Sequence, residues 1–136
     1  MLDILALYAL TIAFGGMVFF TALFSPLVFV KLPAETAGPF IRQVFPWYFA
    51  ATAVVLGLAG LALLAGAPIW GAVLLVMAAL GAFNREILMP RINGLRDRQL
   101  AGDATAGRAF DRLHKASVVI HLIQMIAAGA ALSHFA

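Results

Sequence analysis

The stretch that decides the fold runs from Arg108 to Met125 and reads RAFDRLHKASVVIHLIQM. Read as a helix at about 100° per residue, it places four polar side chains on one face, because they are three, four and three residues apart. These residues are His114, Ser117, His121 and Gln124. Apolar residues, mainly valine, leucine and isoleucine, cover the other faces from residue 116 onward. The pattern predicts a polar stripe on an apolar helix, which other helices must enclose within a membrane.

The composition of the whole chain is typical of a membrane protein. Its 136 residues are 64% hydrophobic and 11% charged, whereas soluble domains are about half apolar and a quarter charged. Residues 4–30, 43–84 and 116–136 contain no Asp, Glu, Lys or Arg, and a membrane span needs roughly 20 such residues. The middle run is long enough for two spans folded at Gly66-Ala67-Pro68. We therefore predict one all-α domain over residues 1–136, an integral membrane four-helix bundle with spans at about residues 4–30, 46–65, 69–89 and 113–134.

The positive charges predict how the bundle is oriented. All nine Lys and Arg residues lie around the connections between spans one and two and between spans three and four. With four spans, these connections share one side, which the positive-inside rule makes cytoplasmic. We expect an inner-membrane protein with both termini and the Gly66 turn on the periplasmic side, and with helices three and four extended into the cytoplasm. The net charge of +3 follows from this topology, and no basic face with interleaved aromatics points to nucleic acid.

Glycines, prolines and aromatics predict several local features of the first two spans. Gly15-Gly16 is expected to be a packing notch in span one. Residues 31–44 are expected to lie along the membrane interface as a short amphipathic segment. Pro46 should then open span two, with the aromatics of residues 45–49 in a belt at headgroup depth.

The second half of the chain carries similar signals. Small residues recur in spans two and three, which favours close approach of these helices. Pro90 should kink the third helix as it leaves the membrane. Gly102-Asp103 should form a turn and an N-cap that begin a helix at Ala104.

His121 is the residue on which the candidate chemistry depends. If Leu113 marks the inner boundary, His121 lies about 12 Å further along the helix, near the midplane. An imidazole at that depth is a functional hypothesis by default. The competing interpretation is a hydrogen bond across the bundle, to Thr11, to Asn84 or to a second copy of the chain.

No complete catalytic set accompanies His121. Haem or a metal would need a second strong ligand, and spans one to three contain no His, so that ligand would come from another subunit. Ser117 and His121 are one turn apart, but no acid shares their depth. Proton-coupled export lacks a membrane carboxylate, because Asp3 is terminal and Glu86 lies at the boundary beside Arg85. The chain has no Cys for thiol chemistry. We therefore favour a non-enzymatic protein, and the sequence leaves the identity of any metal or cofactor open.

Several segments together resemble the transmembrane-protein-205-like family. They are Phe24-Ser25-Pro26 through Leu32-Pro33, QVFPWYF at 43–49, NREILMPR at 84–91, and Phe110 to His114 with Ser117 and His121. The resemblance covers nearly the whole chain and implies a four-helix membrane domain without an established reaction, whose eukaryotic relatives are associated with platinum-drug resistance. It singles out Pro46, Asn84 and His114 as special positions. The eukaryotic pattern has Asn at the position of His121, a departure that favours a hydrogen-bonding role over obligatory metal ligation.

We therefore expect a membrane protein that binds or passes a small molecule or ion through the polar stripe. Two alternatives stay open: a haem- or quinone-binding redox protein that shares ligands across a dimer, and a structural or assembly subunit. The expected partners are the lipid bilayer, a small ligand and a second copy of the chain. The candidate residues are His114, Ser117, His121, Gln124, Asn84 and Arg85. Among these, Asn84, Arg85 and His114 are expected to form a polar cluster at the cytoplasmic mouth of the bundle.

Overall fold

The computed structural model describes residues 1–136 as four long helical segments with no strand. The first consists of α1 (Leu2–Phe19), the π-helical turn η1 (Phe20–Phe24) and α2 (Ser25–Lys31), and the second of α3 (Ala34–Leu63). The third consists of α4 (Pro68–Phe83), the π-helical turn η2 (Asn84–Leu88) and α5 (Met89–Leu100), and the fourth of α6 (Ala104–Leu132) and the 3-10 turn η3 (Ser133–Phe135). Each segment is long and apolar enough to cross a membrane. The predicted all-α membrane bundle of four helices is confirmed.

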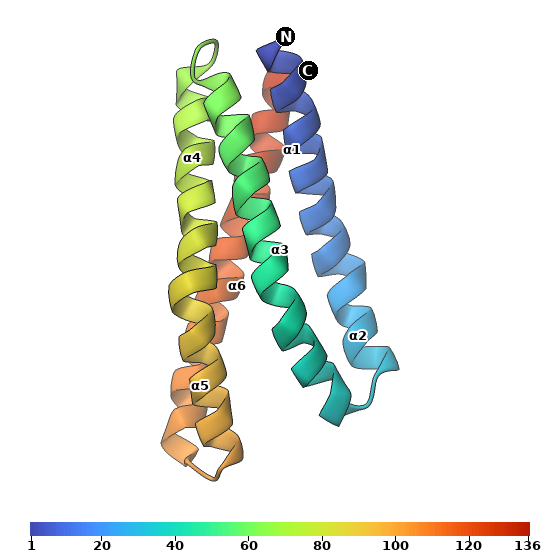
Figure 1. The fold of residues 1–136 in the computed structure, drawn as a ribbon, viewed down its shortest axis with the longest axis vertical. Coiled ribbons are helices and arrows are strands. Elements are labelled where there is room, and N and C mark those ends of the chain that lie inside the picture. Colours follow the sequence, from blue (N-terminus) through green and yellow to red (C-terminus); the bar gives the residue numbers. More distant parts are fainter.

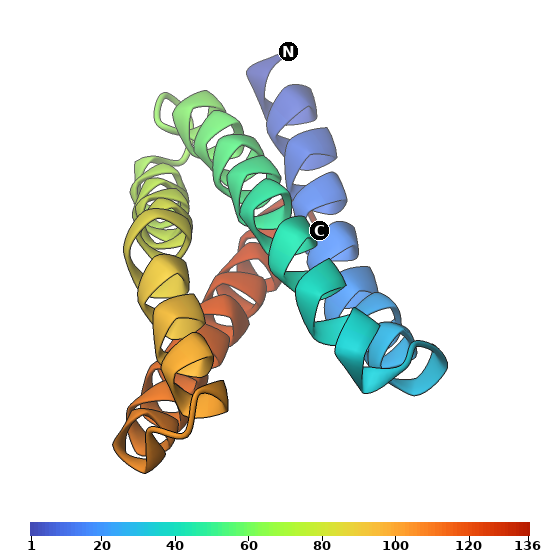
Figure 2. The same cartoon turned by 60° about the horizontal axis from the view of Figure 1, so that its bottom comes forward.

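The four segments run alternately up and down (Figure 1). α3 packs against α1 and α4, while α6 packs against α1, α4 and α5. Both termini and the turn between α3 and α4 lie at one end of the molecule. At the other end, α2 with the start of α3 and α5 with the start of α6 form two hairpins that diverge (Figure 2). Eight of the nine Lys and Arg residues lie on α2, α5 and the first halves of α3 and α6, and the ninth, Arg85, lies on η2 next to α5.

α3 and α4 approach each other closely because glycines lie where they cross. A Cβ added to Gly60 would lie 3.0 Å from the carbonyl oxygen of Gly71, and one added to Gly71 would lie 2.9 Å from that of Gly60. Neither position has room for a side chain. The prediction that small residues bring these helices together is confirmed at these two positions, as expected where hydrophobicity alone cannot drive helix association.

The core between the helices is apolar, and so is much of the outer surface. Leu10, Leu56 and Leu74 are fully buried in the main cluster. On the outside, Ile69 is 78% exposed and Ile126 is 68% exposed. Exposed large apolar side chains on every helix are costly in water and natural in lipid. Together with the four apolar helices, they identify a multi-pass integral membrane protein.

The second helix begins earlier than the sequence predicts. α3 begins at Ala34, and both Pro39 and Pro46 lie inside it, so the predictions of a separate interfacial segment at 31–44 and of a helix start at Pro46 are wrong. The reason is tertiary packing: Ala37 and Ile41 are buried with residues of η1 and α2. Apolar burial on this face outweighs the one backbone donor that each proline removes.

Both π-helical turns precede a proline by the same distance. η1 ends at Phe24, two residues before Pro26, and η2 ends at Leu88, two residues before Pro90. Proline lacks a donor, and its ring crowds the carbonyl four residues earlier, so a wider turn relieves the conflict without ending the helix. The irregularity expected at Pro90 therefore lies in the turn before it.

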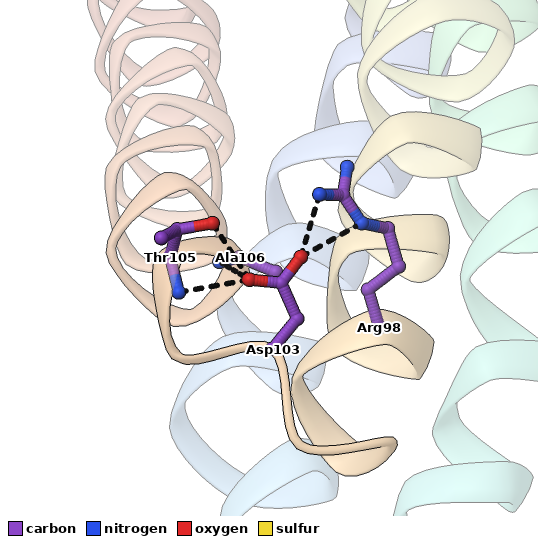
Figure 3. A network of polar contacts seen from close by, with 4 residues as sticks. All are labelled: Arg98, Asp103, Thr105 and Ala106. Atoms are coloured by element: carbon purple, nitrogen blue, oxygen red, sulfur yellow. Dashed lines mark hydrogen bonds and ion pairs between the residues drawn. The ribbon is translucent and has the colours of Figure 1, made fainter.

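The connection between α5 and α6 is closed by the predicted turn and cap. Gly102 has a φ of 99°, which favours glycine. The Asp103 carboxylate accepts from the backbone N–H groups of Thr105 and Ala106, from the Thr105 hydroxyl and from Arg98 (Figure 3). The bond from the Thr105 hydroxyl, followed by the bonds from Arg98 and the backbone, lowers the pKa of Asp103 well below its usual range. The predicted N-cap at Asp103 is confirmed.

Candidate functional site

Three helical segments meet at the ring of His121. Its Nε2 atom lies 2.9 Å from the Thr21 hydroxyl of η1 and 3.2 Å from the Tyr48 hydroxyl of α3. If Nδ1 carries the proton, Nε2 accepts from these hydroxyls, and if Nε2 carries it, Nε2 donates to one of them. In either tautomer Nδ1 is buried and has no hydrogen-bond partner. We call Thr21, Tyr48 and His121 the polar centre.

Aromatic rings fix the polar centre in place. The Phe20 ring stacks on Tyr48 with centroids 3.8 Å apart. Tyr48 and Phe49 both present edge-to-face contacts to the imidazole, at 5.6 Å and 6.3 Å. Such pairs add to the burial of the rings and restrict their rotation. The aromatics of residues 45–49 therefore do not form one outward belt: Tyr48 and Phe49 face the bundle, while Trp47 is 78% exposed.

Two buried side-chain amides connect α6 to the third helical segment. One contact, from Asn84, lies one turn before His121 on α6, and the other, from Gln124, lies one turn after it. The Asn84 side chain donates from Nδ2 to the Ser117 carbonyl oxygen at 3.3 Å. The Gln124 side chain donates from Nε2 to the Met77 carbonyl oxygen at 2.8 Å, in space left by Gly81, where a Cβ would lie 2.9 Å from that nitrogen. Both side chains are fully buried. Each amide thus ties α6 to the third helical segment.

Three buried polar atoms in this region have no partner. They are Asn84 Oδ1, His121 Nδ1 and Gln124 Oε1. Burying a polar atom without a hydrogen bond costs about 1–3 kcal/mol. Three such atoms on or against α6 indicate a region that is not optimised for stability.

A groove between α1 and α3 reaches Tyr48, the one residue of the polar centre that lines it, from the side of the bundle. Its volume is about 270 Å³, and no charged side chain lines it. The lining residues are Ile12, Ala13, Gly16, Phe19, Phe20, Tyr48, Ala51, Thr52 and Val55. Ile12 and Phe19 are exposed on the outer surface, whereas Thr52 is buried. The groove therefore connects the lipid-facing surface to a face of Tyr48.

The groove also explains Gly15-Gly16, and the prediction of a packing notch there is wrong. A Cβ added to either glycine would meet nothing within 4 Å. The glycines lie toward open space because α3 packs against other faces of α1, through Leu10, Ala13 and their neighbours. Gly16 keeps the groove open.

Comparison with known protein families identifies the family to which the chain belongs. A model of a domain of unknown function, DUF4149, matches residues 8–101. The chain belongs to the DUF4149 family. No curated protein and no solved structure matches it. The matched residues of this DUF4149 protein include Thr21, Tyr48 and Asn84, whereas His121 and Gln124 follow on α6.

The predicted site residues are only partly brought together in this DUF4149 protein. Ser117, His121 and Gln124 of the stripe are buried, but His114 is exposed and stacks on Phe110 at 5.6 Å. The predicted cluster of Asn84, Arg85 and His114 is therefore wrong. Asn84 meets α6 at Ser117, one turn further into the bundle, because Asn84 is farther along the chain from Gly102 than His114 is.

Arg85 turns away from α6. Its Nε donates to the Pro46 carbonyl oxygen at 3.0 Å, and its guanidinium pairs with Glu86. Arg85 therefore links the third segment to α3 at the level of the π-helical turn η2. It contributes a bridge between helices and does not contact His114.

The residues that complete the polar centre are ones that sequence reasoning did not assign to it. Thr21 is a lone hydroxyl in an apolar span, and Tyr48 is one aromatic among several. The sequence feature that could have identified them is that a hydroxyl group inside a membrane needs a hydrogen-bond partner. No three His, Cys, Asp or Glu side chains gather anywhere in the structure, and the neighbours of the His121 imidazole are hydroxyl and aromatic groups.

Proposed function

We propose that this DUF4149 protein binds a small uncharged molecule at the polar centre, and that its bundle serves to hold or pass that molecule. The observation that carries the proposal is the set of buried atoms without partners, at Asn84, His121 and Gln124. A chain selected only for stability would replace such groups or pair them. A bound ligand with its own polar atoms is one way to satisfy such unpaired groups.

The groove supports a neutral ligand over an ion. Its lining contains no charged side chain, and its outer rim is formed by exposed apolar residues. A bare ion would need carboxylates or a wet path to offset its desolvation. A lipid-soluble molecule needs neither, because it can enter the groove from the bilayer and place a polar group against the Tyr48 and Thr52 hydroxyls.

The two alternatives receive less support. A redox role with haem would require a second strong ligand facing His121, whereas the groups around its ring are hydroxyl and aromatic side chains. A purely structural role does not explain why three buried polar atoms are left unpaired. A quinone remains one member of the class of neutral, lipid-soluble ligands that the groove fits.

We also propose that the chain is a member of the transmembrane-protein-205-like branch of membrane proteins. The motif residues Pro46 and Asn84 support this, since both take part in contacts between helices: the Pro46 carbonyl accepts from Arg85, and Asn84 donates to Ser117. The Asn found at the position of His121 in eukaryotic members can keep a hydrogen bond to Thr21 or Tyr48. The His121→Asn variant should therefore still fold and retain part of the binding.

Mass spectrometry of compounds that co-purify with the full chain tests the function. Wild-type protein should carry a neutral lipophile at a fixed ratio, His121→Asn a reduced amount, and His121→Leu almost none. A compound present equally in all three proteins would show that the polar centre does not bind it. Retained haem in the wild type, lost in both variants, would favour the redox alternative.

A further inference from the structure

A second groove lies at the end of the molecule where the basic residues gather, between α5 and α6. Its volume is about 390 Å³, and its lining consists of Arg91, Gly94, Leu95, Arg98 and Leu113. Arg91 and Arg98 are seven residues apart and so lie on one face of α5, about 10 Å apart along its axis. A Cβ added to Gly94 would meet nothing within 4 Å, so the groove is open between the two arginines.

The charges around this groove are not balanced within the protein. The three ion pairs of the structure are Arg42 with Asp97, Arg85 with Glu86, and Arg98 with Asp103. Asp103 therefore compensates Arg98, while Arg91 is exposed and takes part in none of these pairs. No carboxylate lines the groove. Arg91 therefore supplies one unpaired positive charge to the groove. The surrounding basic segments add to the positive electrostatic potential there.

The membrane-facing end of the groove, at Arg91 and Leu113, lies near the depth of lipid headgroups if the uncharged runs mark the hydrocarbon core. Arg91 follows the end of the run at Asn84 by seven residues, or about 10 Å, and Leu113 precedes the run that starts at Ala116 by about 5 Å. The headgroup layer extends some 5 to 8 Å on each side of the hydrocarbon. Long arginine side chains readily span the remaining distance.

We infer that this groove binds the headgroup of an anionic phospholipid. A guanidinium recognises a phosphate through paired N–H donors, which Arg91 can supply. Leu113, the lining residue nearest the hydrocarbon core, offers apolar contact to the glycerol region. The uncompensated charge of Arg91 favours a lipid with net negative charge over a zwitterionic lipid, which carries its own cation. The inference does not depend on the proposed ligand of the polar centre.

Native mass spectrometry of the full chain, titrated with phosphatidylglycerol and with phosphatidylcholine of the same acyl chains, tests the site. Wild type should bind phosphatidylglycerol about fivefold more tightly, the ratio expected for one basic residue at a membrane surface. Arg91→Gln should remove that preference. The matched control Arg108→Gln loses the same charge from an exposed position on α6 outside the groove, and it should change binding less than about twofold.

A second pair of variants tests the groove without changing charge. Gly94→Leu fills the groove and should reduce phosphatidylglycerol binding as Arg91→Gln does, while Gly38→Leu, which also adds a side chain in open space, should leave it unchanged. Equal losses in Arg91→Gln and Arg108→Gln would reduce the site to diffuse attraction and overturn the inference. So would unaltered binding in Gly94→Leu, equal binding of the two lipids, or displacement of the lipid by equimolar inorganic phosphate.

Discussion

At the scale of single residues, Gln124 shows how a polar side chain in the bundle interior lowers the stability of the fold. Its Nε2 donates to Met77, but its Oε1 is buried without a partner. A hydrogen bond between membrane helices contributes about 1 kcal/mol or less, whereas an unsatisfied buried oxygen costs about 1–3 kcal/mol. The unpaired atom therefore outweighs the bond, and Gln124 lowers the stability of the ligand-free bundle.

Gln124→Met should accordingly raise the free energy of unfolding by about 1 kcal/mol, because a side chain of similar size replaces a half-satisfied amide. The same change should weaken ligand retention. Thermal unfolding in detergent, with the ligand removed, measures the first effect. A less stable variant would mean that the amide is structural, which contradicts the role proposed for it.

Asp103 is the residue whose ionisation the structure links to stability. Its pKa is lowered by the bond from the Thr105 hydroxyl, and further by Arg98 and the backbone of α6. A lowered pKa means that the ionised cap stabilises the fold above the unfolded value of about 4. This stabilisation is lost as the pH falls through the lower folded value.

We expect Asp103→Asn, which keeps an acceptor oxygen but loses the charge, to be less stable than wild type near pH 6. The difference between the two proteins should shrink as the pH falls below 4 and disappear in strong acid, because both caps are then neutral. Unfolding followed by circular dichroism across that range measures it. A difference that stays constant with pH would show that charge at Asp103 contributes nothing.

At the scale of helical elements, the relation between α1 and α3 controls access to the polar centre. The helices pack through Ala13 and its neighbours, while Gly15 and Gly16 face open space. Only Gly16 lines the groove. The two adjacent glycines therefore form a matched pair of positions, of which one borders the groove and the other does not.

Gly16→Leu should fill the groove and lower the amount of bound compound about tenfold, since forcing atoms into an occupied site costs about 1–3 kcal/mol. Gly15→Leu adds the same side chain and should leave binding unchanged. Mass spectrometry of extracted compounds gives both values. Equal losses would point to general disturbance of α1, and cross-linked dimers lost only in Gly16→Leu would assign the groove to a second copy.

The same elements show which features could be predicted from the sequence. The four apolar spans, the turn at Gly66 and the cap at Asp103 were predictable because each depends on residues that are neighbours in the sequence. The start of α3 was not, because burial of Ile41 against η1 and α2 overrides the signal of Pro46. Tyr48 was missed for a related reason: its partner His121 is 73 residues away, and no local pattern marks such a contact.

At the scale of the whole molecule, the basic residues gather at the end opposite the termini. On the basis of the positive-inside rule, we propose that the Gly66 turn and both termini lie outside the cytoplasm. The chain contains no cysteine, so single cysteines can report each end without interference. This orientation also places the Arg91 groove on the inner leaflet.

Pro68→Cys should react with a membrane-impermeant maleimide in intact cells, because residue 68 follows the outer turn. Ala101→Cys, exposed at the other end, should react only after the membrane is opened. A maleimide that carries a large mass tag shifts the labelled protein on a gel, and so shows which of the two variants has reacted. The reverse pattern would invert the topology.

If a small uncharged molecule binds at the polar centre, it changes the environment of the buried His121 Nδ1 atom. Nitrogen-15 NMR of histidine-labelled protein measures this atom, with the signal of His121 assigned from its loss in His121→Asn. Adding the compound recovered from wild-type protein should shift the Nδ1 resonance of His121 and leave those of His114 and His134 unchanged. A His121 Nδ1 resonance that does not move while the compound is bound would contradict the account.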